Sequence, residues 1–218
     1  MRFNQVLPSF SVKSQQNNSR SPRIYVSFAA LDDHALVAKI QAGEKNAFAT
    51  LVSRWQDKVY TQCYRQLGNE ELAQEAAQEI FIKLYKGLGS FQFQAKFSTW
   101  LFRIVLNHCS NLRDYHFRRK KDFHEPLEGS NLDNPRQLQA QMDLPDQRME
   151  REEQREIIQS CLNELPEEQR EILILRDIQG LSYEEISEAL SLNLGTVKSR
   201  VHRARNSLRP ILQEALKK

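Results

Sequence analysis

The sequence predicts an all-α protein built from two small helical domains. Apolar residues recur at steps of three and four along most of the chain, and no run shows the period of two that an exposed strand requires. Seven glycines and seven prolines interrupt 218 residues, of which 40% are hydrophobic, so the chain can bury a core. An acidic stretch that contains prolines separates an N-terminal helical region from a C-terminal one. It predicts a flexible linker at residues 122–151.

Residues 1–30 are expected to form a disordered polar and basic tail. Serine, glutamine and asparagine dominate the stretch from Ser11 to Ser21, and the basic residues of this segment have no acidic counterpart. Such a composition buries too little apolar surface to offset the entropy lost on ordering. We therefore place the first domain at residues 31–121.

The first domain begins with three predicted helices. The first is capped by Asp32 or Asp33 and stops near Gly43, the second ends at Gly68, and the third runs from about Asn69 to Leu88. The third helix leaves a polar side exposed that includes Gln78, Glu79 and Lys83. A solvated face explains these polar residues as well as a docking surface does, and helix geometry alone does not decide between the two.

A long helix is predicted from Thr99 to about Arg119, with Ser98 as its cap. One side is apolar, and the other carries a row at i, i+3, i+7 and i+11: Trp100, Arg103, Asn107 and Asn111. An aromatic ring, a guanidinium and two amides in one row are suited to stacking on unpaired bases and hydrogen-bonding to them. The alternative is that the ring belongs to the core and the amides are solvated.

Two further features of this region favour binding to nucleic acid. The loop before the helix contains Phe91 and Phe93, and exposed rings there would hold a base that has left the stack. The helix ends in Arg118, Arg119, Lys120 and Lys121, a basic cluster suited to phosphate binding. The linker that follows has seven acidic residues and two arginines between Asp122 and Glu150, which opposes DNA binding by the linker itself.

The second domain, residues 152–218, contains a predicted helix-turn-helix. It starts with a helix from about Arg151 and another opened by Pro166. Ser182 and Glu185 form a capping box, and after a short break Asn193 caps a last helix that runs to about Arg209, where Pro210 follows.

The last predicted helix has one apolar and one basic face. Its inward side is Val197, Val201, Ala204 and Leu208; its outward side and flanks are Thr196, Lys198, Ser199, Arg200, His202, Arg203 and Arg205. Small polar and arginine side chains near a helix N-terminus match the major groove of DNA. A solvated basic face on an ordinary bundle helix is the alternative interpretation.

Two helical DNA-facing modules joined by an acidic linker resemble the sigma factors of bacterial RNA polymerase, in particular the extracytoplasmic-function group of the sigma-70 family. The resemblance covers about Leu31 to Leu212. The string AQEIFIKLY (77–85) is similar to the polymerase-binding helix and FSTWLFRIVLN (97–107) to the promoter-melting helix. The strings LPEEQREILILRDIQGLSYEEISEAL (165–190) and GTVKSRVHRAR (195–205) are similar to the second domain.

The resemblance implies roles at the matching positions. Gln78, Glu79 and Lys83 would dock on the clamp helices of the polymerase's largest subunit. The residues at the −10 element would be Phe91, Phe93, Trp100, Arg103, Asn107, Asn111, Arg118 and Arg119. Those at the −35 element would be Thr196, Lys198, Ser199, Arg200, His202 and Arg203. Core RNA polymerase, promoter DNA and an anti-sigma factor are the partners that the resemblance implies.

No catalysis, cofactor or metal is expected. The sequence has no glycine-rich phosphate loop, no nucleophile beside a base and no clustered carboxylate pair. His108, His116 and His124 are spaced too widely for a zinc site. A DNA-processing enzyme such as a recombinase is therefore disfavoured.

Cysteine usage and hydropathy favour a cytoplasmic protein. Cys63, Cys109 and Cys161 are odd in number and far apart, which suits a reducing compartment, and Cys63 lies on an apolar helix stripe as a core residue would. No apolar run approaches the roughly 20 residues of a membrane span, and the first residues lack the apolar segment of a secretory signal.

A one-site transcriptional regulator is the second interpretation. It would bind an operator through the helix-turn-helix and use the N-terminal helices to sense or to dimerise. Such a protein does not need the row from Trp100 to Asn111, whereas a sigma factor needs it to open the promoter. With a net charge of +3, the free chain is expected to bind promoter DNA weakly and in a salt-sensitive manner.

Overall fold

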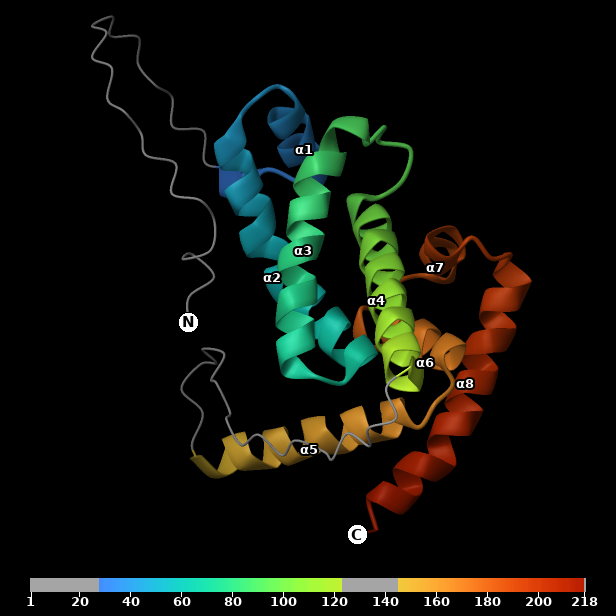
Figure 1. The fold of residues 1–218 in the computed structure, drawn as a ribbon. Coiled ribbons are helices and arrows are strands. Elements are labelled where there is room, and N and C mark those ends of the chain that lie inside the picture. Colours follow the sequence, from blue (N-terminus) through green and yellow to red (C-terminus); the bar gives the residue numbers. More distant parts are fainter. Residues whose placement is uncertain (1–27, 123–144, 218) are drawn as a thin grey trace, which may run out of the picture.

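The computed structural model describes residues 28–122 and 145–217, and within these ranges it contains helices and no strand (Figure 1). The all-α fold class is confirmed. Residues 1–27 of the predicted tail and 123–144 of the predicted linker lie outside the described residues. No helix in the described ranges is both long and apolar enough to cross a membrane.

The N-terminal half follows the predicted helices closely. Its elements are η2 (Phe28–Ala30), α1 (Asp33–Gln41), α2 (Lys45–Leu67), α3 (Glu70–Gly87), η3 (Leu88–Ser90) and α4 (Phe97–Asp122). Asp32 caps α1 by accepting a hydrogen bond from the Ala35 backbone N–H at 2.7 Å, and Asn69 caps α3 in the same way. The disordered tail was predicted to reach residue 30. Residues Phe28–Ala30 instead form η2, and Phe28 packs against the core, so the predicted tail is too long.

The start of α4 corrects a prediction. The helix begins at Phe97, so Ser98 lies in its first turn and is not the cap; the backbone N–H of Trp100 bonds to the Lys96 carbonyl at 3.2 Å. Phe97 is buried, and its ring lies 5.7 Å from that of Trp55 on α2. Packing of this ring extends the helix beyond the point that the capping preference of serine indicates.

The C-terminal half contains α5 (Pro145–Asn163), α6 (Glu167–Leu173), the π-helical turn η4 (Ile174–Ile178), α7 (Tyr183–Leu190) and α8 (Leu194–Ala215). The predicted helix-turn-helix is α7 and α8. The linker was predicted to reach residue 151, but α5 already begins at Pro145. Proline is tolerated at the first helical position, since its missing N–H would have no partner inside the helix.

The end of α8 also corrects a prediction. The helix continues through Pro210 to Ala215, whereas the sequence predicted an end near Arg209. Proline removes one backbone hydrogen bond and strains the preceding turn. Leu208 and Ile211, on either side of it, pack against the core, and this burial offsets the loss.

The two predicted domains pack against each other in this structure. Helices α2, α3 and α4 lie side by side, and α5 runs across the end of α2 (Figure 1). Arg65 near the end of α2 donates a hydrogen bond to the Gln159 side chain on α5 at 3.1 Å, and Arg170 on α6 donates to the Gln66 carbonyl at 3.2 Å. The buried apolar residues of both halves form one continuous cluster.

Gly68 lies at this junction. Its φ of 70° is left-handed, and a Cβ there would lie 3.0 Å from the Asn163 side chain of α5. Both the backbone conformation and the close approach therefore require glycine.

The cysteines of the N-terminal half belong to the core. Cys63 on α2 and Cys109 on α4 are both buried. The hydrogen bond between the two thiols and burial together raise the pKa of Cys63. A thiol that remains protonated is a poor nucleophile, so the interpretation of Cys63 as a core residue is confirmed.

Replacement of Ser182 tests the capping box at the start of α7. The Ser182 hydroxyl accepts a hydrogen bond from the Glu185 N–H at 3.1 Å, and the Glu185 carboxylate accepts one from the Ser182 N–H at 2.7 Å. We expect Ser182→Ala to lower the free energy of unfolding by about 1 kcal/mol in urea denaturation. Ser160→Ala, at an exposed position inside α5, is the control. Equal stability of the two variants would contradict the capping role.

Candidate nucleic-acid interface

The polar row on α4 has the orientation that its spacing predicts. Arg103, Asn107 and Asn111 are exposed, and Trp100 is half-buried. The opposite side of α4 is held in the core by Leu101 and other buried residues. The row is thus placed by the helical period, and its amide and guanidinium groups lie outside the core.

The loop before α4 presents one phenylalanine rather than two. Phe91 is buried and its ring lies 5.0 Å from that of Trp100, so the expectation of an exposed Phe91 ring is wrong. Phe93 remains 38% exposed, with a φ of 59° that is uncommon for a large side chain. The Gln41 side chain fixes the loop by donating hydrogen bonds to the carbonyls of Leu88 and Phe91, at 2.8 and 3.0 Å.

The outward face of α8 is also formed as predicted. Val197, Val201 and Ala204 are buried. Asn193 caps the helix by accepting a hydrogen bond from the Thr196 N–H at 2.7 Å. The exposed side chains on the other face are Lys198, Ser199, His202 and Arg203, and Thr196 is half-buried. Arg118 and Arg119 at the far end of α4 are exposed as well.

Two arginines of α8 are paired with acids of the same half. Arg200 Nη1 lies 3.1 Å from Glu168 Oε2 on α6. Arg205 makes two contacts with the Asp177 carboxylate, at 2.5 and 3.2 Å. A fork of this kind holds the guanidinium in place. Arg200 was predicted at the DNA face, and in this structure its charge is directed to Glu168.

The third predicted surface lies on α3. Glu79 and Lys83 are exposed and Gln78 is half-buried. Two exposed apolar side chains accompany them, Ile82 at 53% and Tyr85 at 45%. Neither residue was predicted to belong to this surface, although their spacing of four and seven residues from Gln78 indicates the same helix face. Apolar side chains among polar ones are typical of a protein-binding surface.

His108 lies beneath this α3 surface. Its ring is 5% exposed, its Nδ1 lies 2.6 Å from Lys83 Nζ, and its Nε2 lies 3.5 Å from Glu79 Oε2. An ammonium donates only, so the short contact requires an unprotonated Nδ1. Burial, with the Lys83 charge as a second cause, lowers the pKa of His108, against the opposite effect of Glu79. A neutral His108 therefore accepts a hydrogen bond from Lys83 and helps to hold this ammonium in place.

The chain matches two models of known protein families. Residues 51–122 match sigma-70 region 2, and residues 155–208 match sigma-70 region 4. The chain belongs to the sigma-70 family. It is 36% identical over 187 residues to RNA polymerase sigma-H factor of Pseudomonas aeruginosa, covering 84% of this chain and 97% of that protein. It is 37% identical over 182 residues to the ECF RNA polymerase sigma factor SigW of Bacillus subtilis, covering 82% and 95%.

Two solved structures are also similar to this chain. CnrH, solved in complex with the cytosolic domain of CnrY, has a TM-score of 0.60 and 28% identity, covering 84% of this chain and 97% of that one. The sigma factor RpoE of Bartonella quintana, solved with the anti-sigma factor NepR, has a TM-score of 0.60 and 26% identity, covering 76% and 96%. A sigma factor recognises promoters together with RNA polymerase, so the one-site regulator is not favoured.

The position of His108 gives this sigma factor a pH dependence that can be measured. Its ordinary pKa is 6.5 and the folded state lowers it, so the unfolded chain binds more protons below that pH. We expect the free energy of unfolding to decrease as the pH falls below 6.5, and to decrease less in His108→Asn. Urea denaturation over this range measures the slope. His202→Asn, at an exposed position, is the control, and equal slopes for wild type and His108→Asn would refute the assignment.

Proposed function

We propose that this sigma factor opens promoters through two helices: α8 binds duplex DNA and α4 binds bases that have unpaired. The outward face of α8 binds the duplex of the −35 element in the major groove, with Lys198, Ser199, His202 and Arg203 as its contacts. Thr196 and Arg200 border this face. The supporting observation is that α8 is capped, buried along one side and basic along the other. This is the geometry that a recognition helix needs.

The row on α4 captures bases of the −10 element as they leave the stack. Unpairing costs a few kcal/mol per flipped base, and stacking and hydrogen bonds to the freed base return part of this cost. Asn107 and Asn111 supply the amides, Arg103 supplies the guanidinium, and Phe93 supplies the exposed ring of the loop. Phe91 and Trp100 hold that loop against α4, and Arg118 and Arg119 lie toward the phosphates.

The α3 surface docks on core RNA polymerase. Gln78, Glu79 and Lys83 contribute polar contacts, and Ile82 and Tyr85 contribute apolar ones. The polymerase carries out RNA synthesis, and the sigma factor itself catalyses no step. By analogy with the two solved relatives that are bound to a partner protein, an anti-sigma factor holds this chain inactive in the cytoplasm.

In vitro transcription tests the proposal as a whole. The purified chain with core polymerase is expected to give transcripts with defined start sites on a genomic template library, and core polymerase without the chain is the control. Upstream of the mapped starts, shared −10 and −35 sequences are expected. A complete absence of defined starts would overturn the proposal.

Asn107→Ala tests the role of the α4 row. We expect promoter opening to decrease about tenfold, because one base loses a hydrogen-bonding amide and such contacts contribute about 1–3 kcal/mol. Permanganate reactivity of unpaired thymines with holoenzyme present measures the opening. Asn46→Ala, at an exposed amide of α2, is the matched control. If Asn107→Ala opens the promoter as the wild type does, the row has no part in melting.

Ile82→Ala tests the α3 surface. The side chain is exposed, so stability should change little, whereas affinity for core polymerase is expected to decrease about tenfold if Ile82 is buried at the interface. Fluorescence anisotropy of labelled chain titrated with core enzyme measures the dissociation constant. Ile158→Ala, at a 41% exposed isoleucine of α5, is the control. An unchanged affinity in Ile82→Ala would place the docking surface elsewhere.

A further inference from the structure

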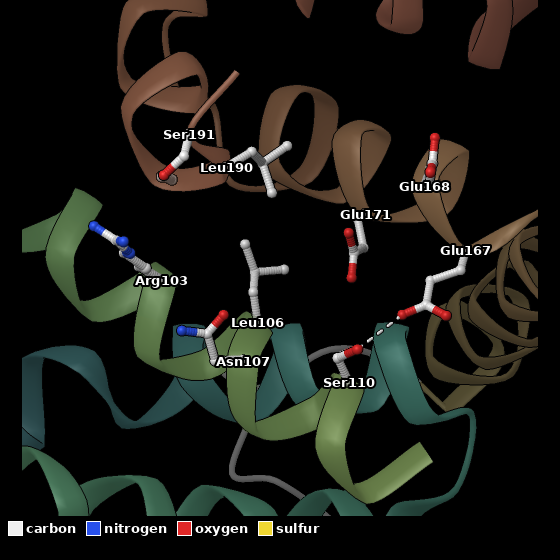
Figure 2. A pocket seen from close by; sticks show the side chains of 10 residues that line it. Arg103, Leu106, Asn107, Ser110, Glu167, Glu168, Glu171, Leu190 and Ser191 are labelled. Carbon is white, nitrogen blue, oxygen red and sulfur yellow. Dashed lines mark hydrogen bonds between the residues drawn. The ribbon is translucent and has the colours of Figure 1, made fainter. Parts of the chain in front are cut away.

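The C-terminal half closes over the α4 side that carries the proposed −10 residues. Figure 2 shows the cleft between them: Arg103, Asn107 and Ser110 project from α4, and Glu167 and Glu171 lie opposite on α6. The cleft has a volume of about 450 Å³. Asn107 and Arg103 therefore line the same cleft as carboxylates of the C-terminal half, with Ser110 nearest to those carboxylates in Figure 2.

Three glutamates of α6, Glu167, Glu168 and Glu171, form what we call the acidic patch. On the α4 side, the Ser110 hydroxyl donates a hydrogen bond to Glu167 at 3.2 Å. The Arg113 guanidinium lies against Glu167 and 3.8 Å from Glu171. Ser110 follows Asn107 by three residues, so these contacts lie beside the −10 row.

The acidic patch also contacts the proposed −35 face. Glu168 pairs with Arg200 of α8 at 3.1 Å, and Arg203 lines a small hollow beside Glu168. Carboxylates of one short helix thus reach basic residues of both DNA-facing helices. They occupy positions beside these cations where DNA phosphates would also be attracted.

Partial burial shields the central contact from solvent. The Arg113 side chain is 23% exposed and that of Glu171 is 17% exposed. Burial lowers the pKa of Arg113 and raises that of Glu171. Salt screens such a pair less than it screens charges on the open surface, and loss of one partner leaves the other charge poorly compensated.

Other contacts hold the same closed arrangement. Lys96, just before α4, lies 2.9 Å from Glu185 on α7. Leu106 and Leu190 point toward each other across the cleft in Figure 2, and Leu106 is 5% exposed. The closed form therefore combines apolar burial with ion pairs on both sides of the cleft.

We propose that the acidic patch is an internal competitor of promoter DNA. In the closed chain it pairs with Arg113 and Arg200 and repels the phosphates of any strand approaching Asn107. A single strand reaches α4 only after the C-terminal half has moved away. The inference rests on the proposed function of the α4 row. It adds that, in the free factor, the acidic patch blocks access of DNA to this row. It also provides a structural reason for the weak DNA binding that we expect of the free chain.

The first experiment removes the charges of the patch. Glu167→Gln with Glu171→Gln is expected to bind a labelled random-sequence single-stranded DNA about tenfold more tightly than wild type, the factor expected when the closed form predominates about nine to one. Asn107→Ala added to this variant should abolish the gain. Glu188→Gln with Glu214→Gln changes net charge equally at exposed positions of the same half and should give no comparable gain. Equal gains in both double variants, or none in either, would overturn the proposal.

The second experiment follows closure directly. A zero-length carbodiimide cross-linker should join the Lys96 amine to the Glu185 carboxylate in the free chain, and mass spectrometry identifies the linked peptides. Saturation with the same single-stranded DNA should reduce the yield of this cross-link several-fold. DNA binds only the open form, and Lys96 lies beside Glu185 only in the closed form. An unchanged yield with DNA bound would overturn competition between the patch and the strand.

Transcription with core polymerase separates the two possible failures. If the wild-type chain starts transcription at defined sites but its DNA affinity does not depend on the acidic patch, the competitor role is wrong and the proposed function stands. If no variant starts transcription, the proposed function itself fails.

Discussion

Burial of one face of α4 is the constraint on which the rest of this structure depends. Leu101, Val105 and Cys109 are almost fully buried, and Phe97 anchors the first turn against Trp55. With this face fixed, the helical period leaves Arg103 and Asn107 no other direction than outward. The same core positions His108, which hydrogen-bonds to Lys83 on α3. One helix therefore organises both the proposed strand-capturing row and the proposed polymerase surface.

In the helix-turn-helix, local hydrogen bonds fix the orientation of α8 relative to α7. Ser191 turns the chain at a left-handed φ of 54°, and the Leu192 N–H bonds back to the Ser187 carbonyl at 2.9 Å. The Ser187 hydroxyl also contacts the Leu192 carbonyl at 2.5 Å. A capping box precedes this turn and Asn193 follows it, so the two helices meet at a defined angle through bonds within a short segment. Such local definition suits a helix whose outward residues must fit a groove.

Electrostatics explain why a basic DNA-facing chain closes on itself. The net charge is only +3, but the charges are segregated: α8 and the end of α4 are basic, and the first turn of α6 is acidic. Glutamates at a helix N-terminus are favoured by the helix dipole, which makes the acidic patch compatible with a stable α6. The patch then finds its cations on α4 and α8, where DNA would otherwise bind.

Much of the fold follows from short-range patterns in the sequence. The limits of α7, the cap Asn193, a first cap at Asp32 or Asp33, and the outward faces of α4 and α8 were all predicted, because they depend on helical spacing and on side chains bonding to backbone within a few residues. Three of the predictions that failed concern long-range packing. Phe91 is buried by Trp100, α4 starts early because Phe97 packs on α2, and α8 passes Pro210 because Leu208 and Ile211 are held by the core.

The sequence by itself determined the helices, their polar faces and the resemblance to the sigma-70 family. The tertiary structure alone decided that the two halves share one apolar cluster, and that Arg113 and Arg200 are directed to glutamates of α6. The reason is physical. Periodicity specifies which side of a helix is buried, but the partner of that side, and of each charge beside it, depends on contacts between residues far apart in the chain.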